Sequence, residues 1–124
     1  MRYNPHQHAA RLGIQVEYVP ALPWRGRWLP DKGIIELRQG MRWHDERSTL
    51  THERAHAILG HIETTPKNER AADRWAAHKL IDPDELRRVT ALSDDPAQWC
   101  LDLETAPRHL RIYQETQCST LSQP

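Results

Sequence analysis

The chain has 124 residues, in which 17 basic residues balance 17 acidic ones and 27% of all residues are charged. A chain of this length is expected to form one domain. Its neutral net charge creates no field that would recruit nucleic acid or an anionic membrane. The sequence also lacks an apolar signal core and any apolar stretch of membrane-spanning length. We therefore expect a cytoplasmic protein that binds neither nucleic acid nor membranes directly.

The first third of the chain is rich in predicted strands. Asn4 is a good N-cap for a short helix that ends at Gly13. Apolar and polar residues alternate over 14–18, which predicts a half-buried strand. Residues 25–29 and 34–37 flank a Gly-containing turn and predict a β-hairpin.

The rest of the chain is predicted to be helical from its cap residues, prolines and glycines. The expected helices run from Asp45 or Ser48 to about Leu59, from Thr65 to about Ile81, from Asp84 to about Ala91, from Asp95 to about Leu101 and from Thr105 to about Gln114. This order indicates an α+β fold, with a small N-terminal sheet or hairpin packed on a helical bundle. We expect a single domain with four parts: a strand-rich part (1–43), two central helices (44–81), C-terminal helices (82–118) and a disordered tail (119–124).

The chemistry is carried by residues 52–56, which read His-Glu-Arg-Ala-His on a predicted helix. Residues four apart lie one turn apart on the same helix face, so His52 and His56 can bind one Zn²⁺ at about 2.0–2.1 Å. Glu53 is displaced by about 100° around the helix, close to the metal, where it can take a proton from water. The alternative for this motif alone is a solvated helix with two surface histidines.

The third metal ligand follows from spacing along the chain. The metzincin pattern is excluded, because Leu59 and Ile62 stand where it needs glycine and histidine. Glu63 lies about 10 Å along the axis from the second histidine if the helix continues, which is too far to share the ion. It stays an alternative ligand, because the helix is predicted to end close to it. Glu69 lies on the next helix, which can pack antiparallel after a short turn. Asp73 follows one turn later and can hold a ligand histidine through its free ring N–H. The alternative for both acids is a solvated helix face.

The remaining histidines receive no role in the metal site. His78 lies about 13 Å beyond the third ligand along its helix, and His61 is one residue out of register for a metzincin ligand. No partner at ligand spacing exists for three others, His6, His8 and His109. His44 precedes the motif helix and could reach the cleft to stabilise an oxyanion. Arg47 and Arg54 are expected at the solvated surface.

Two stretches, 47–61 (RSTLTHERAHAILGH) and 69–81 (ERAADRWAAHKLI), resemble the ImmA/IrrE family of metallopeptidases. The hairpin strand 33–37 is similar to the strand that precedes the active helix in that family. The resemblance implies one Zn²⁺ ion and general-base work by Glu53. Carried over residue by residue, it implies the metal ligands His52, His56 and Glu69, as in a gluzincin.

Three positions depart from the family's pattern. Ala55 replaces the usual glycine before the second histidine, Ala71 replaces a frequent glutamate, and Trp75 replaces phenylalanine. None of these changes removes a ligand, so they affect the expected substrate preference rather than the chemistry.

The resemblance also implies a function. Members of the family often belong to phages and mobile elements and cleave, or help to inactivate, helix-turn-helix repressors. We therefore expect a zinc metallopeptidase whose substrate is a repressor-like protein. An extended substrate could pair with an exposed edge of the strand formed by Ile34, Ile35, Glu36 and Leu37. The alternatives are a zinc-containing antirepressor that sequesters its partner without cutting it, and a protein that binds no metal.

Overall fold

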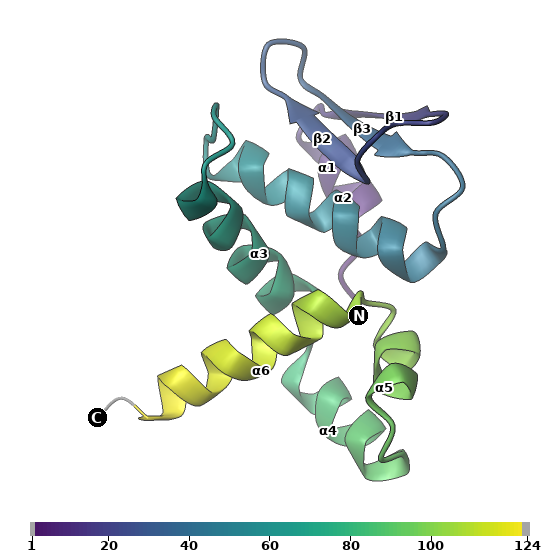
Figure 1. Ribbon diagram of the computed structural model, residues 1–124, viewed down its shortest axis with the longest axis vertical. Coiled ribbons are helices and arrows are strands. Elements are labelled where there is room, and N and C mark those ends of the chain that lie inside the picture. The colour runs from purple at the N-terminus through teal and green to yellow at the C-terminus, as the bar shows by residue number, and fades with distance from the viewer. Residues whose placement is uncertain (1, 123–124) are drawn as a thin grey trace.

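A computed structural model of the chain describes residues 2–122, with side chains described as far as residue 117. Its elements are α1 (Pro5–Arg11), β1 (Gln15–Val19), β2 (Gly26–Leu29), β3 (Ile34–Arg38), α2 (Trp43–Ile58), α3 (Pro66–Leu80), α4 (Pro83–Leu92), α5 (Pro96–Leu103) and α6 (Pro107–Ser122). The predicted α+β class is confirmed. The sheet lies over one side of α2, and α3 and α6 cross on its other side (Figure 1). Within the described part of the chain, no helix combines the length and apolar character needed to span a membrane.

The sheet has the strand order β1-β3-β2, so β3 is its central strand. It pairs in parallel with β1 and antiparallel with β2. The predicted exposed edge at Ile34, Ile35, Glu36 and Leu37 is therefore wrong. Ile35 and Leu37 are fully buried and pack against Leu50 of α2. The two edge strands of the sheet are β1 and β2, and β2 is the one that packs against α2.

Helix α2 begins at Trp43, before the predicted caps. Asp45 lies in the first turn, where an acidic side chain interacts favourably with the helix dipole. Ser48 is buried inside the helix and joins it to the start of α6. Its hydroxyl lies 3.1 Å from the hydroxyl of Thr105 and accepts the backbone N–H of Ala106 at 2.7 Å.

The middle of α2 is buried on all sides, because residues 47–56 pack against the sheet and against the other helices. The expectation that Arg47 and Arg54 lie at the surface is wrong, since their exposed fractions are 1% and 0%. The Arg47 guanidinium donates to the carbonyl oxygens of Tyr3 at 3.0 Å and Glu104 at 2.9 Å. It thus ties the N-terminal segment and the end of α5 to the helix that carries the motif.

Helices α3, α4 and α5 begin within one residue of their predicted starts, whereas α6 begins two residues after the predicted Thr105. Thr65, Asp82 and Asp95 each accept a backbone N–H near the start of the helix that follows. The next residue is proline in each case, which is favourable in a first turn because its missing N–H has no partner to lose there. Helix α6 continues to Ser122, past the predicted end near Gln114. Of the predicted disordered tail, residues 123–124 lie outside the described residues, and for 119–122 only the backbone is described.

Candidate metal centre

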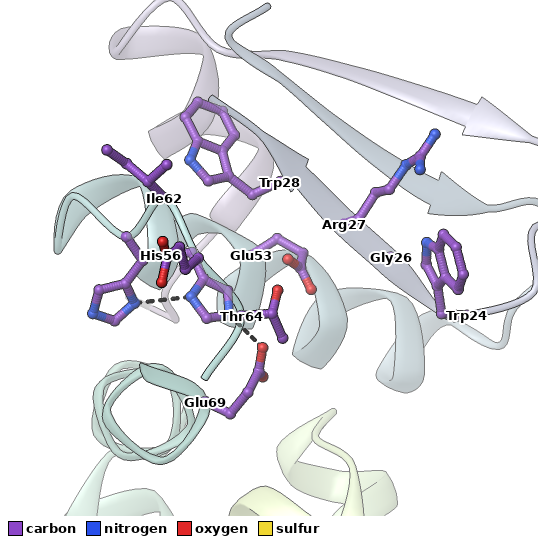
Figure 2. A pocket seen from close by; sticks show the side chains of 11 residues that line it. Trp24, Gly26, Arg27, Trp28, Glu53, His56, Ile62, Thr64 and Glu69 are labelled. Atoms are coloured by element: carbon purple, nitrogen blue, oxygen red, sulfur yellow. Dashed lines mark hydrogen bonds and ion pairs between the residues drawn. The ribbon is translucent and has the colours of Figure 1, made fainter. Parts of the chain in front are cut away.

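Three donor groups from two helices meet at one point. His52 and His56 lie one turn apart on α2, and their Nε2 atoms are 3.1 Å apart. Glu69 lies in the first turn of α3. One of its carboxylate oxygens is 2.8 Å from His52 Nε2, and the other is 3.2 Å from His56 Nε2. Figure 2 shows His56 and Glu69 facing each other at the floor of the cleft, with Glu53 beside them.

These donors fit a divalent metal ion. In a tetrahedral site with bonds of about 2.0–2.1 Å, neighbouring ligand atoms are about 3.3–3.4 Å apart. The separations here are 2.8 to 3.2 Å, and all three ligand atoms lie within 4.8 Å of one another. Two imidazoles and one carboxylate form the ligand set of zinc sites that keep a position open for water. The structure thus brings together the three residues predicted as ligands.

Each of the two histidines is held from behind by a second residue. His52 Nδ1 lies 2.8 Å from Asp73 Oδ1, where its N–H donates to the carboxylate. In a neutral His52 ring this contact places the hydrogen on Nδ1, so that Nε2 can bind a metal. His56 Nδ1 lies 2.9 Å from His61 Nδ1, and His61 also donates its backbone N–H to the carbonyl of His56. His61, which the metzincin spacing excludes as a ligand, therefore lies directly behind the predicted ligand His56.

The charges in the site shift the pKa values of these groups. Burial disfavours the charged His52 ring, but hydrogen bonds to Asp73 and Glu69 outweigh it and raise the pKa to about 9. Burial and the neighbouring His52 lower the pKa of His56. Although burial opposes it, hydrogen bonds from His109 and His52 hold the pKa of Asp73 well below its usual range. Asp73 thus remains ionised, and a hydrogen bond from His52 also lowers the pKa of the ligand carboxylate Glu69, as metal binding requires.

Glu53 lies beside the ligands and lines a cleft of about 470 Å³. The residue is only 8% exposed, and this burial raises the pKa of its carboxyl to about 7, against opposing effects of His52 and of a hydrogen bond from the Trp28 backbone. A group with a pKa near neutrality can both accept and return a proton. Trp28 and Ile62 lie together at one end of the cleft (Figure 2).

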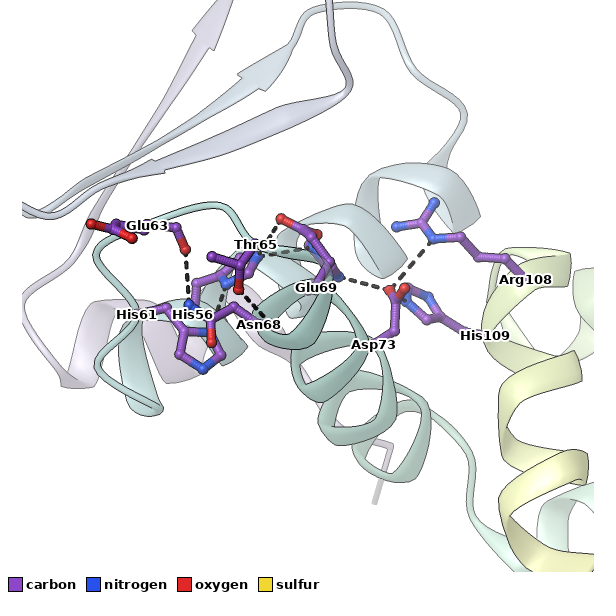
Figure 3. Close-up of polar contacts among 10 residues, drawn as sticks. His56, His61, Glu63, Thr65, Asn68, Glu69, Asp73, Arg108 and His109 are labelled. Carbon is purple, nitrogen blue, oxygen red and sulfur yellow. Dashed lines mark hydrogen bonds and ion pairs between the residues drawn. The ribbon is translucent and has the colours of Figure 1, made fainter.

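His109 belongs to the site, although its spacing in the sequence predicts no metal-ligand partner for it. It is fully buried, and its Nε2 lies 3.0 Å from Asp73 Oδ1. Arg108 approaches the same oxygen, with its Nε at 3.8 Å (Figure 3). Burial lowers the pKa of His109 to about 4, so its ring is neutral near pH 7. No spacing signal could reveal this contact, because α6 reaches α3 only through the tertiary fold.

The other histidines lie elsewhere. His44 is 3.8 Å from Asp45 and does not line the cleft, so the structure does not bring it to the site. His78 is 2.8 Å from the hydroxyl of Thr116. Glu63 lines the cleft but is absent from the group of converging ligand atoms.

The chain matches the model of a known protein family. The peptidase M78 family, described as the IrrE N-terminal-like domain, matches residues 9–121, which is nearly the whole chain. No curated protein matches the chain.

Proposed function

We propose that this chain, which belongs to the IrrE N-terminal-like family of peptidases, is a zinc-dependent endopeptidase that cuts a protein substrate. The observation that carries the proposal is the convergence of His52, His56 and Glu69 beside Glu53 at the floor of an open cleft. Two imidazoles and a carboxylate with an adjacent buried acid form the minimal apparatus for metal-assisted hydrolysis.

Each residue has a part in the proposed reaction. When bound, Zn²⁺ supplies a Lewis acid that lowers the pKa of water and polarises the scissile carbonyl. His52, His56 and Glu69 would hold the ion. Glu53 takes the proton of the attacking water on its carboxylate as the new C–O bond forms, and then passes it to the nitrogen of the leaving amine as the C–N bond breaks. Burial raises the pKa of Glu53 to about 7 in the metal-free site, and a bound cation would lower it, so the carboxylate would be ready to accept the proton.

The edge strand β2 offers a place for an extended substrate. Arg38 donates its N–H to the carbonyl of Arg25 at 2.8 Å, so these two residues form a hydrogen-bonded pair of the antiparallel ladder. Bonded and non-bonded pairs alternate along such a ladder. The backbone groups of Gly26 and Trp28 therefore point away from β3, toward the open side. A peptide that adds to this edge would pair with the backbone of Gly26 and with the carbonyl of Trp28, whose N–H donates to Glu53.

Gly26 brings this edge close to α2. A Cβ atom at this position would lie 2.8 Å from Thr49 Cγ2 and 3.0 Å from the carbonyl oxygen of Glu36, which is closer than van der Waals contact allows. Thr49 lies one turn before Glu53 on α2. The glycine therefore allows the strand backbone to run beside the proposed base, as a substrate strand at this edge requires.

We further propose that the substrate is a repressor-like regulator of the helix-turn-helix class, encoded by a phage or mobile element. The support for this substrate is the resemblance of residues 47–61 and 69–81 to the ImmA/IrrE family. A repressor gene next to the gene for this chain would supply a specific substrate for the assay.

The test compares Glu53→Gln with wild type. The matched control is Glu63→Gln, because Glu63 is an exposed acid that lines the same cleft. Each purified protein is assayed by elemental analysis for zinc and by mass spectrometry for cleavage of a peptide library and of the neighbouring repressor. We expect one zinc in each of the three proteins. Wild type and Glu63→Gln should cleave the substrate, whereas Glu53→Gln should not. His56→Ala should lose the zinc. Unchanged cleavage by Glu53→Gln would refute the role of the base. Inactivation of the repressor without cleavage would instead support a sequestering antirepressor.

A further inference from the structure

We propose that His109 is a positioning residue of the metal centre, which acts through Asp73 to hold His52 in the orientation that metal binding needs. The inference rests on the proposed metal-binding function. It assigns a role to a residue of α6 that lies outside the group formed by His52, His56 and Glu69, although its ring nitrogen converges with His52 and Asp73 in a second group of donor atoms.

The geometry is a chain of three side chains from three helices. His52 on α2 and His109 on α6 both contact the same oxygen of Asp73 on α3, at 2.8 Å and 3.0 Å. One carboxylate oxygen thus receives two N–H donors. Figure 3 shows Asp73 on α3 between Glu69 and the side chains of Arg108 and His109 at the start of α6. The position of the Asp73 carboxylate is therefore set from both sides.

The protonation of His109 follows from this contact. Because Asp73 can only accept, the hydrogen of the neutral His109 ring must be on Nε2. Its Nδ1 then carries a bare lone pair that is buried and has no hydrogen-bond partner among the described residues. An unpaired buried nitrogen is destabilising. Packing alone would favour an apolar side chain at this position. What the imidazole adds is its N–H toward Asp73.

Arg108 explains why Asp73 needs a second donor. Its Nε lies 3.8 Å from the oxygen that His52 and His109 share, which is too long for a hydrogen bond but close enough for attraction. Without the N–H of His109, the carboxylate could turn toward the guanidinium and release His52. The donor on α6 therefore keeps the oxygen directed at His52, and the tautomer of His52 follows from that contact.

The experiment measures zinc affinity by competition with a chelator for wild type, His109→Leu, His109→Phe and His109→Gln. The Leu and Phe variants lack the donor, whereas the glutamine amide N–H can reach Asp73. Partners behind ligand histidines contribute about 10–100-fold to metal affinity. We expect at least a tenfold loss for Leu and Phe, and an affinity within about twofold of wild type for Gln. The control variant is His78→Leu, in which the replaced histidine contacts Thr116 away from the site. Its zinc affinity should match that of wild type.

A second readout distinguishes positioning from general stability. In the zinc-loaded proteins, ¹⁵N–¹H NMR should show a protected His52 Nδ1–H in wild type and His109→Gln, and an exchange-broadened signal in the Leu and Phe variants. Wild-type affinity in the Leu and Phe variants would overturn the inference while leaving the proposed function intact. Equal losses in Gln, Leu and Phe would also overturn it, because packing would then explain the effect. Absence of zinc from wild type would overturn the proposed function and this inference together.

Discussion

The Nδ1 atoms of His56 and His61 lie 2.9 Å apart. When a metal is bound at the Nε2 of His56, the hydrogen between the two rings belongs to the Nδ1 of His56, and His61 accepts it. The loop after α2 therefore folds back onto the helix and orients one ligand from behind. His52 has a charged partner, Asp73, whereas His56 has a neutral one.

This difference predicts unequal effects on metal binding. Asp73→Asn replaces an ionic acceptor, so zinc affinity should fall by about 10–100-fold. His61→Ala removes only a neutral acceptor that is partly exposed, where water can take its place. We expect a loss of less than about tenfold for this variant. Chelator competition measures both, and a larger loss for His61→Ala would contradict the assignment of partners.

Zinc binding should release a proton and depend on pH. In the metal-free protein the pKa of His52 is raised to about 9, so its ring is protonated at pH 7. A histidine that binds a metal must be neutral, so binding at pH 7 should release about one proton. Affinity should rise with pH, by up to about tenfold per unit, and level off near pH 9.

Isothermal titration calorimetry in two buffers of different ionisation enthalpy measures this proton count. Asp73→Asn removes a hydrogen bond that raises the pKa of His52, so it should release fewer protons at pH 7. Binding that is independent of pH between 6 and 9 would contradict a protonated His52.

A side chain at Gly26 should displace the edge strand. The added Cβ of Gly26→Ala would lie 2.8 Å from Thr49 Cγ2, and overpacking of this kind destabilises proteins by about 1–3 kcal/mol. Removing the methyl group in Gly26→Ala/Thr49→Ser should recover part of this loss. Urea unfolding of the single and double variants measures the coupling, and strictly additive effects would mean that the two residues do not meet.

The apolar end of the cleft should select the substrate side chain that lies there. Trp28 and Ile62 line it, and Ile62 is 82% exposed, so a polar residue at position 62 should leave stability unchanged. We expect Ile62→Asp to lower kcat/KM by about tenfold for peptides with a large apolar residue next to the scissile bond. Peptides with a polar residue there should be much less affected.

Leu92→Asp is the matched control for this variant. Leu92 is also exposed, at 78%, but lies on α4 and does not line the cleft. Equal losses for apolar and polar peptides in Ile62→Asp would show that the residue does not determine specificity.

The sequence was sufficient wherever the relevant signal is local. The spacing of His52 and His56 places both rings on one helix face because the helix repeats every 3.6 residues. The same argument places Glu69 and Asp73 on one face of the next helix. Thr65 and Asp95 cap their helices because a side-chain oxygen and the following proline suit a first turn. Each of these relationships spans only a few residues along the chain.

Only the tertiary structure decided which distant segments meet. Alternation predicts that residues 34–37 form a strand, but it says nothing of the partner that makes this strand central and leaves β2 as the edge. The burial of Arg47 depends on carbonyl groups of Tyr3 and Glu104. His109 meets Asp73 because α6 packs across α3. A sequence lists residue types and their local spacing, whereas contacts between distant residues depend on how whole elements bury their apolar faces together.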